Sequence, residues 1–170
     1  MPNGITGVYY NSVLNAIHVQ NPNSPSGYSE FALNPAGGNT YDYSSMLDVS
    51  VRAFFADPPD PISLQPIQSQ VYTELTLQNS YYLPPNTPFY LGIYTGNDPT
   101  GGIYPDPVFG WALLENVNGA IQLLDGALEY GGGGIYTGTQ TIIVPEPSTL
   151  GLLTLGGLLL GWRWRIFSRL

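Results

Sequence analysis

The sequence predicts an all-β fold, an antiparallel β-sandwich of the jelly-roll kind, followed by a single hydrophobic helix at the C-terminus. A composition of 21 Gly, 16 Pro and 13 Tyr among 170 residues favours strands and turns. Residues 1–144 show no convincing helical periodicity, whereas runs that alternate polar and apolar residues are common. About eight to ten short strands, with turns roughly every 8–12 residues, are typical of sandwiches and jelly rolls.

The first half of the body contains four predicted strands. In order they are Gly7–Tyr10, Val13–Val19, Tyr28–Leu33 and Leu47–Phe55. The first two flank Asn11-Ser12, which predicts a hairpin, and loops are predicted at Asn21–Ser26 and Pro35–Asn39. The fourth strand is the cleanest, because its alternate residues form an apolar and a more polar face. The apolar set is Leu47, Val49, Val51, Ala53 and Phe55, and the opposite set is Asp48, Ser50, Arg52 and Phe54.

The second half contains six further predicted strands, separated by residues that break β-structure. They are Val71–Leu77, Phe89–Tyr94, Val108–Glu115, Ala120–Leu124, Ala127–Tyr130 and Ile135–Val144. Turns and loops are predicted at Asp57–Pro61, Pro84–Pro88, Gly96–Pro107, Asn116–Gly119 and Gly131–Gly134. Prolines end strands because they cannot donate to a ladder, and glycines permit tight turns. The pattern over Ser63–Ser69 does not distinguish helix from strand.

Charge and cysteine content narrow the possible functions of the body. Eleven acidic residues against Arg52 alone give residues 1–144 a net charge of −10, while the tail carries +2. Such an acidic body should repel nucleic acid, so no nucleic-acid partner is predicted. The absence of cysteine excludes disulfides, thiolate metal sites and a thiol nucleophile. No cofactor is predicted.

The last 27 residues, Val144–Leu170, have a different composition. Pro145, Glu146 and Pro147 predict an extended segment that suits a linker or the active-site groove of a protease. Ser148 or Thr149 can cap the uncharged, leucine-rich helix that follows. Residues 148–167 would span about 30 Å, the thickness of a bilayer core, and are therefore predicted to cross a membrane.

The predicted helix ends in a basic, aromatic segment. Arg163, Arg165 and Arg169 are interleaved with Trp162, Trp164 and Phe167. Arginines mark the cytoplasmic end of a membrane span, and tryptophans favour its interface. The alternative, a helix buried in the core, is disfavoured by these arginines. The sequence thus divides into a body (1–144), a motif (145–147), a membrane helix (148–167) and a basic cytoplasmic end (168–170).

The order of motif, short apolar helix and basic end resembles the bacterial PEP-CTERM sorting signal, with the motif standing as Val144-Pro145-Glu146-Pro147-Ser148-Thr149. The resemblance implies export across the inner membrane of a Gram-negative bacterium. It also implies processing near the motif by an exosortase, a membrane-embedded cysteine transpeptidase-like protease. The family is typical of bacteria that make exopolysaccharide and biofilm matrix. Such proteins also carry an N-terminal secretion signal, and because Met1–Tyr10 lacks its features we expect a further upstream segment.

Two places in the body could bind a ligand. The loop Asn97–Pro107 contains Asp98 and Asp106, and oxygen ligands on a loop suit Ca²⁺. The usual calcium-loop pattern is missing, however, and Asp-Pro pairs commonly form turns, so no metal site is predicted. Trp111 and the tyrosines could stack on sugar rings, but the apolar sequence around Trp111 favours a core position.

Evidence for catalysis is weak. His18 is the only histidine and is predicted to lie on the strand face opposite Ile17 and Val19. No nucleophile-elbow motif accompanies it, so a Ser/His/Asp triad is disfavoured. Thr137, Thr139 and Thr141 alternate as on ice-binding surfaces, yet one such run is ordinary strand composition. No catalytic residue is predicted.

These observations predict an exported cell-surface or extracellular-matrix protein with a non-catalytic, structural or adhesive role. Its C-terminus would be cytoplasmic during transit, and its body periplasmic and then at the surface or outside the cell. The alternative is a carbohydrate-binding module acting on exopolysaccharide, which a groove lined by aromatic residues would favour. A third hypothesis is an enzyme acting on matrix polysaccharide, which would require a cleft with two close carboxylates.

Overall fold

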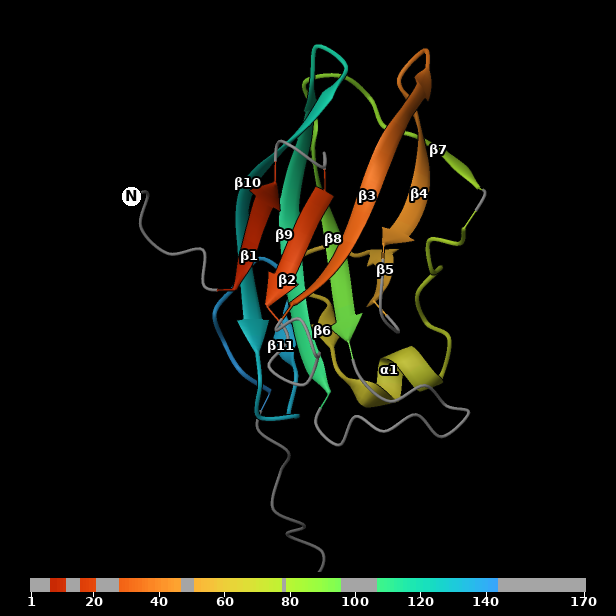
Figure 1. Ribbon diagram of the computed structural model, residues 1–170. Coiled ribbons are helices and arrows are strands. Elements are labelled where there is room, and N and C mark those ends of the chain that lie inside the picture. Colours follow the sequence, from red (N-terminus) through yellow and green to blue (C-terminus); the bar gives the residue numbers. More distant parts are fainter. Residues whose placement is uncertain are drawn as a thin grey trace, which may run out of the picture.

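The computed structural model describes residues 7–11, 16–20, 28–46, 51–77, 79–95 and 107–143. Within them, Figure 1 shows two large β-sheets that lie face to face. The first sheet has the order β1 (Val8–Asn11), β2 (Ala16–Gln20), β3 (Tyr28–Gly37), β4 (Thr40–Met46) and β7 (Ser80–Tyr82). The second has the order β10 (Ala120–Glu129), β9 (Val108–Val117), β8 (Pro88–Thr95) and β5 (Val51–Phe55). The strand pairs of both sheets are antiparallel, as predicted.

A smaller layer lies outside the second sheet. It contains the short ladder of β6 (Pro61–Ile62) and β11 (Ile135–Tyr136), together with α1 (Leu64–Gln68). The segment that the sequence left unassigned therefore forms a single helical turn. None of the helices in the described ranges is long and apolar enough to cross a membrane. The helix predicted over 148–167 lies outside those ranges.

The connections follow the predicted jelly roll only in part: β7 returns to lie beside β4 and β8 to lie beside β5, whereas the other neighbours are consecutive strands. In a jelly roll, built from Greek keys, strands return by long connections to lie beside earlier ones. Here β1 to β4 are consecutive neighbours in one sheet, and β8 to β10 are consecutive neighbours in the other. Tight turns hold these neighbours together. Both residues of the β3–β4 turn, Gly38 and Asn39, have positive φ, as do Asn118 and Gly119 between β9 and β10.

The space between the two sheets holds the main core. Phe31 and Leu33 of β3 lie in the same buried cluster as Leu91 and Ile93 of β8 and Leu114 of β9. These side chains are at most 3% exposed. Burying each such side chain stabilises the fold by about 1.5–3 kcal/mol. The alternation along β3, β8 and β9 thus supplies the two inner faces of the sandwich.

A second core covers the outer face of the second sheet. Phe54, Phe109 and Trp111 pack there against Ile62 and Ile135 of the small layer. The indole N–H of Trp111 donates to the carbonyl of Thr139 at 2.7 Å. The predicted core position of Trp111 is confirmed. Phe54, predicted to lie on the more polar face, is fully buried because this third layer covers it, whereas Phe55 is 39% exposed.

A buried asparagine joins three turns at one end of the sandwich. Asn116 is fully buried, and its Oδ1 accepts a hydrogen bond from the Tyr41 hydroxyl at 2.7 Å. Its Nδ2 donates to the carbonyl of Leu83 at 2.9 Å and to Oδ1 of Asn39 at 3.2 Å. Its carbonyl accepts from the N–H of Asn86 at 2.8 Å. The tips of the β3–β4 and β9–β10 hairpins lie at the same end of the molecule (Figure 1).

Several predicted strands have different limits. Val71–Leu77 forms only an isolated bridge, between Glu74 and Phe54, and Val71 is 68% exposed. The predicted loop at Pro35–Asn39 is mostly strand, because β3 continues to Gly37. The predicted closing strand Ile135–Val144 is reduced to β11, after which the chain turns back. β4 and β7 are not among the predicted strands, because their polar and tyrosine-rich sequences show no clear apolar face.

Candidate functional site

The described body ends in a segment held by several hydrogen bonds. The N–H of Ile143 donates to the carbonyl of Gly134 at 2.8 Å, and Ile142 forms a bridge with Ile135. Thr137 is fully buried, and both its N–H and its hydroxyl donate to the carbonyl of Asp60, at 2.9 and 3.1 Å. The backbone is therefore fixed to the small layer as far as Ile143.

A buried carboxylate orders the turn that begins this segment. Glu129 is 5% exposed and accepts hydrogen bonds from the N–H groups of Gly131 and Gly134, the latter at 3.0 Å. Gly134 has a φ of +105°, and a Cβ at this position would lie 2.5 Å from the carbonyl oxygen of Ile62. Only glycine fits both the backbone conformation and this close approach. The predicted turn at Gly131–Gly134 is confirmed.

The predicted sorting residues follow this segment. Pro145, Glu146, Pro147, Arg163, Arg165 and Arg169 lie outside the described residues, as do Asp98 and Asp106 of the candidate calcium loop. Within the described residues, no three His, Asp or Glu side chains gather closely enough to hold a metal ion. The prediction of a calcium-free loop stays a prediction.

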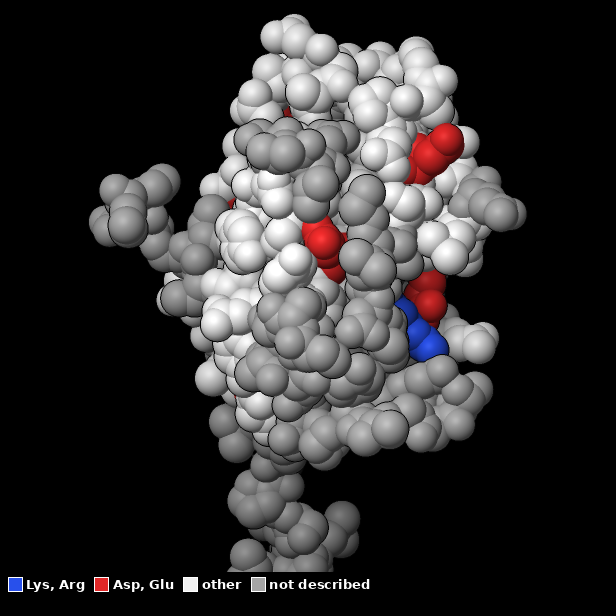
Figure 2. Space-filling model, viewed as in Figure 1, with Lys and Arg blue, Asp and Glu red and all other residues white. Residues whose placement is uncertain are grey.

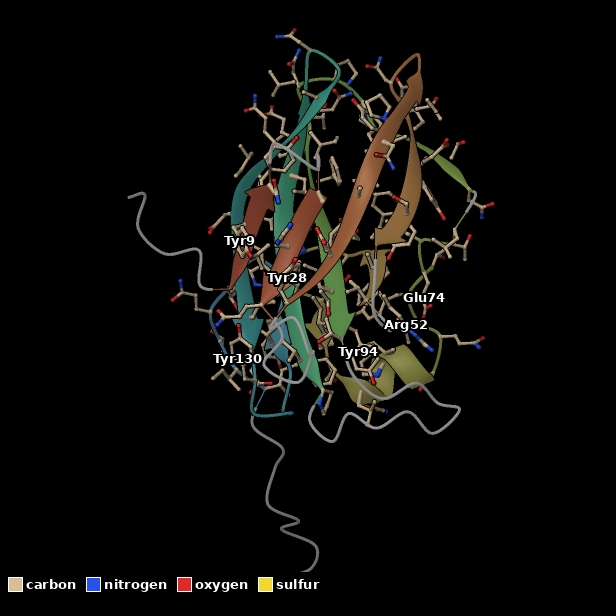
Figure 3. All side chains as sticks on the ribbon, viewed as in Figure 1. Tyr9, Tyr28, Arg52, Glu74, Tyr94 and Tyr130 are labelled. Atoms are coloured by element: carbon tan, nitrogen blue, oxygen red, sulfur yellow. The ribbon has the colours of Figure 1, made fainter. Side chains whose placement is uncertain are left out.

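His18 lies in a cluster on the outer face of the first sheet. Its ring stacks on Tyr28, with centroids 4.7 Å apart, and is tilted against Tyr9 at 4.8 Å. Nδ1 lies 3.0 Å from the Tyr9 hydroxyl, and Nε2 lies 3.1 Å from Nδ2 of Asn11. The carboxylate of Glu30 lies 2.7 Å from Nε2. Figure 3 shows Tyr9 and Tyr28 side by side on this face.

The His18 cluster is closed rather than open to a substrate. The histidine does lie on the face opposite Ile17 and Val19, as predicted, but it is only 4% exposed. The tyrosine rings cover it, and Glu30 is equally buried. The described contacts of the imidazole include no serine hydroxyl, so they do not assemble the triad that the sequence analysis disfavoured.

A groove of about 570 Å³ lies beside the end of β5. Its walls come from residues 55–57, 60–61, 66 and 71–73. Tyr72 is part of this lining; its hydroxyl donates to the carbonyl of Pro61 at 2.7 Å, and its ring stacks on Phe54 with centroids 4.4 Å apart. Burial, with a smaller contribution from the charge of Asp60, raises the pKa of Tyr72 to about 12. This groove is not predictable from the sequence, because three separate segments form it.

Positive charge is scarce on the body. Arg52 is the one lysine or arginine in residues 1–144. Its Nη1 lies 3.2 Å from Oε1 of Glu74, and both side chains are about one-third exposed. Figure 2 shows this cation in contact with an acidic side chain, and Figure 3 labels the pair. The lining of the groove includes two acidic residues, Asp57 and Asp60, and no basic residue.

The described residues define the class of protein as one with an antiparallel β-sandwich body. The family model of the PEP-CTERM protein-sorting motif matches residues 144–166, starting directly after Ile143. The chain thus carries the C-terminal signal of secreted proteins that exosortases process, as the sequence predicted. Comparisons with curated proteins and with solved structures gave no match.

Proposed function

We propose that the chain is an exported cell-surface or extracellular-matrix protein, processed by an exosortase near Pro145–Pro147, with a non-catalytic, structural or adhesive body. The observation that carries this proposal is the match of the sorting motif to residues 144–166. The hydrogen bond of Ile143 supports it, because it holds the body in place up to the residue that precedes the motif. Cleavage within the motif would therefore leave the body intact.

In transit, residues 148–167 anchor the chain in the inner membrane. Arg163, Arg165 and Arg169 stay on the cytoplasmic side, following the positive-inside rule, and the body lies in the periplasm. The four glycines among residues 150–162 weaken the helix by up to about 1 kcal/mol each relative to alanine, on scales measured in water. A marginal helix suits an anchor that is used only until the exosortase acts.

The non-catalytic role is supported by how three buried polar side chains of the body are used. Both ring nitrogens of His18 lie against partners within the first sheet, and the Glu129 carboxylate binds two backbone N–H groups. Asn116 holds turns together. These buried polar groups have structural partners, which is what a stable, passive domain requires.

The test is expression in a Gram-negative host with and without an exosortase, with an export signal supplied upstream and an epitope placed after Leu170. With the exosortase, we expect the body to lose the epitope. A triple variant, Pro145→Ala, Glu146→Ala and Pro147→Ala, should keep it, and Pro84→Ala in the body serves as the control for proline loss. Equal loss of the epitope in both hosts contradicts the proposal.

A further inference from the structure

The groove beside β5 has a partly exposed aromatic wall. Phe55 is 39% exposed, and its ring lies 6.0 Å from Tyr81 and 6.2 Å from Phe89, centroid to centroid. These neighbours are themselves partly buried, so they fix the orientation of the Phe55 ring. A rigid aromatic surface can stack on the C–H-bearing face of a sugar ring without a large ordering cost. A volume of about 570 Å³ is within the usual range for small ligands and admits a short oligosaccharide.

The negative charge of the groove should favour some classes of saccharide over others. Asp57 and Asp60 belong to its lining, and Arg52, the one cation of the body, is paired with Glu74. The charge of Asp60 also contributes to the raised pKa of Tyr72, another residue of the lining. A polymer of uronic acids would be repelled, whereas protonated amines of an amino sugar would be attracted.

The backbone of the groove is poorly suited to a peptide. A peptide that adds a strand needs free N–H and C=O groups. Pro61 and Pro66 have no N–H. The N–H of Asp57 donates to Oδ2 of Asp60, that of Asp60 donates to the carbonyl of Asp57, and that of Val71 donates to the carbonyl of Pro66. The groove thus presents side chains, chiefly an aromatic ring and carboxylates, and these favour a saccharide.

We propose that this groove binds a saccharide chain carrying free amines, with Phe55 stacking on a pyranose ring and Asp57 and Asp60 binding its ammonium and hydroxyl groups. The proposal rests on the proposed adhesive role and gives it a ligand class and a site. The carboxylates accept charge-assisted hydrogen bonds, which are stronger than neutral ones. Because the groove is open to solvent, binding should weaken as salt rises.

The experiment is calorimetric titration of the full chain in mild detergent with three probes of equal length. The probes are oligomers of glucosamine, of N-acetylglucosamine and of glucuronate. We expect the glucosamine oligomer to bind, the acetylated oligomer to bind about tenfold more weakly, and the glucuronate oligomer not to bind. Asp57→Asn should weaken binding of the glucosamine oligomer by about tenfold and reduce the salt dependence of that binding. Phe55→Leu should weaken binding of both the glucosamine oligomer and the N-acetylglucosamine oligomer.

Tyr82→Ala is the matched control, because Tyr82 is a 65% exposed aromatic residue on β7, outside the groove lining. It should bind like the unchanged chain. Absence of glucosamine binding in a folded chain overturns the inference, as does equal binding by the Tyr82 and Phe55 variants. Tighter binding of a lysine oligomer of the same charge also overturns it, in favour of a basic peptide. Normal loss of the C-terminal epitope with no saccharide binding would overturn only this inference.

Discussion

At the scale of single residues, buried polar groups hold the two sheets together at their turns. Asn116 is the clearest case, because its side chain satisfies the Tyr41 hydroxyl and the Leu83 carbonyl at once. Both partners are buried, and a buried polar group left without a partner costs about 1–3 kcal/mol. One side chain thus links β4, β9 and the turn before β8.

Asn116→Ala is expected to lower the free energy of unfolding by about 2–4 kcal/mol, since it leaves two buried partners unsatisfied. Urea unfolding followed by tryptophan fluorescence measures this loss. Gln122→Ala, an exposed position on β10, serves as the control and should change stability by less than about 0.5 kcal/mol. A loss at Asn116 no larger than at Gln122 would remove the structural role assigned to the asparagine.

Ionisation of Tyr72 should lower the stability of the folded protein at alkaline pH. Its pKa in the folded state, about 12, exceeds the ordinary tyrosine value of 10.0, so the folded state holds the proton more tightly. This contribution is complete below pH 10 and is lost as pH rises towards 12. Because the chain has no lysine or cysteine, tyrosines dominate titration in this window. Burial and the charge of Glu74 raise the pKa of Tyr43 as well.

Tyr72→Phe should therefore flatten the decline in unfolding midpoint between pH 9 and about pH 12. At pH 8 the variant should be slightly less stable, because it loses the hydrogen bond to the Pro61 carbonyl. The comparison is of urea midpoints at several pH values, with Tyr82→Phe as an exposed control. Parallel pH profiles for the Tyr72 variant and the unchanged chain would show that this hydroxyl is not the group responsible.

At the scale of elements, the C-terminal segment 135–143 depends on one glycine. Gly134 and Gly37 have nearly the same backbone, with φ of +105° and +104°. A Cβ on Gly37 would meet nothing within 4 Å, whereas one on Gly134 would collide with the backbone of Ile62 and Ser63. Alanine substitutions at the two glycines therefore separate the destabilisation caused by the backbone conformation from that caused by the collision.

Gly37→Ala is expected to lower the free energy of unfolding by about 1 kcal/mol, because a residue with a Cβ is strained at positive φ. Gly134→Ala should cost at least about 1 kcal/mol more, because the collision must also move β6 or β11. It should also make the chain easier to cut by protease near residue 135. Denaturant titration and limited proteolysis of the two variants test this, and equal losses would contradict the geometry of the turn.

Turn residues were the most predictable elements. The turns predicted at Asn116–Gly119 and Pro84–Pro88 both occur, because their local chemistry specifies a turn. Each is shorter than predicted, since β9 continues to Val117 and β8 begins at Pro88. Strand limits and burial were less predictable, because they depend on packing partners distant in sequence. Phe54 is buried because the small layer and the ring of Tyr72 pack against it. Val71 is exposed because its segment pairs with β5 at a single bridge.

At the scale of the whole molecule, the sequence predicted two facing antiparallel sheets but not their connections. Alternation shows that a strand has two faces, and it does not show which sheet the strand joins. The sorting motif was predictable because it is contiguous in the sequence, and the match at 144–166 confirms it. The groove was not predictable, because Phe55, Pro66 and Tyr72 meet only after folding.

The body should fold without the C-terminal tail. Among the described residues, the two hydrophobic clusters are formed by positions up to Ile135, and the N–H of Ile143 donates to the carbonyl of Gly134. The free energy of unfolding of a chain ending at Ile143 should therefore be within about 0.5 kcal/mol of that of the full chain in the same detergent. A chain ending at Gly134 should be clearly less stable, because it loses the bond from Trp111 to Thr139. Equal stability of all three chains would show that the segment 135–143 is not part of the folded body.

The most direct test of the sorting role is the intact mass of the mature protein isolated from its native host. The account predicts a chain that retains Ile143 and lacks Arg163, Arg165 and Arg169, because cleavage near Pro145–Pro147 removes the membrane helix and its basic end. A mature chain that still ends at Leu170, or one cut within residues 135–143, would contradict it.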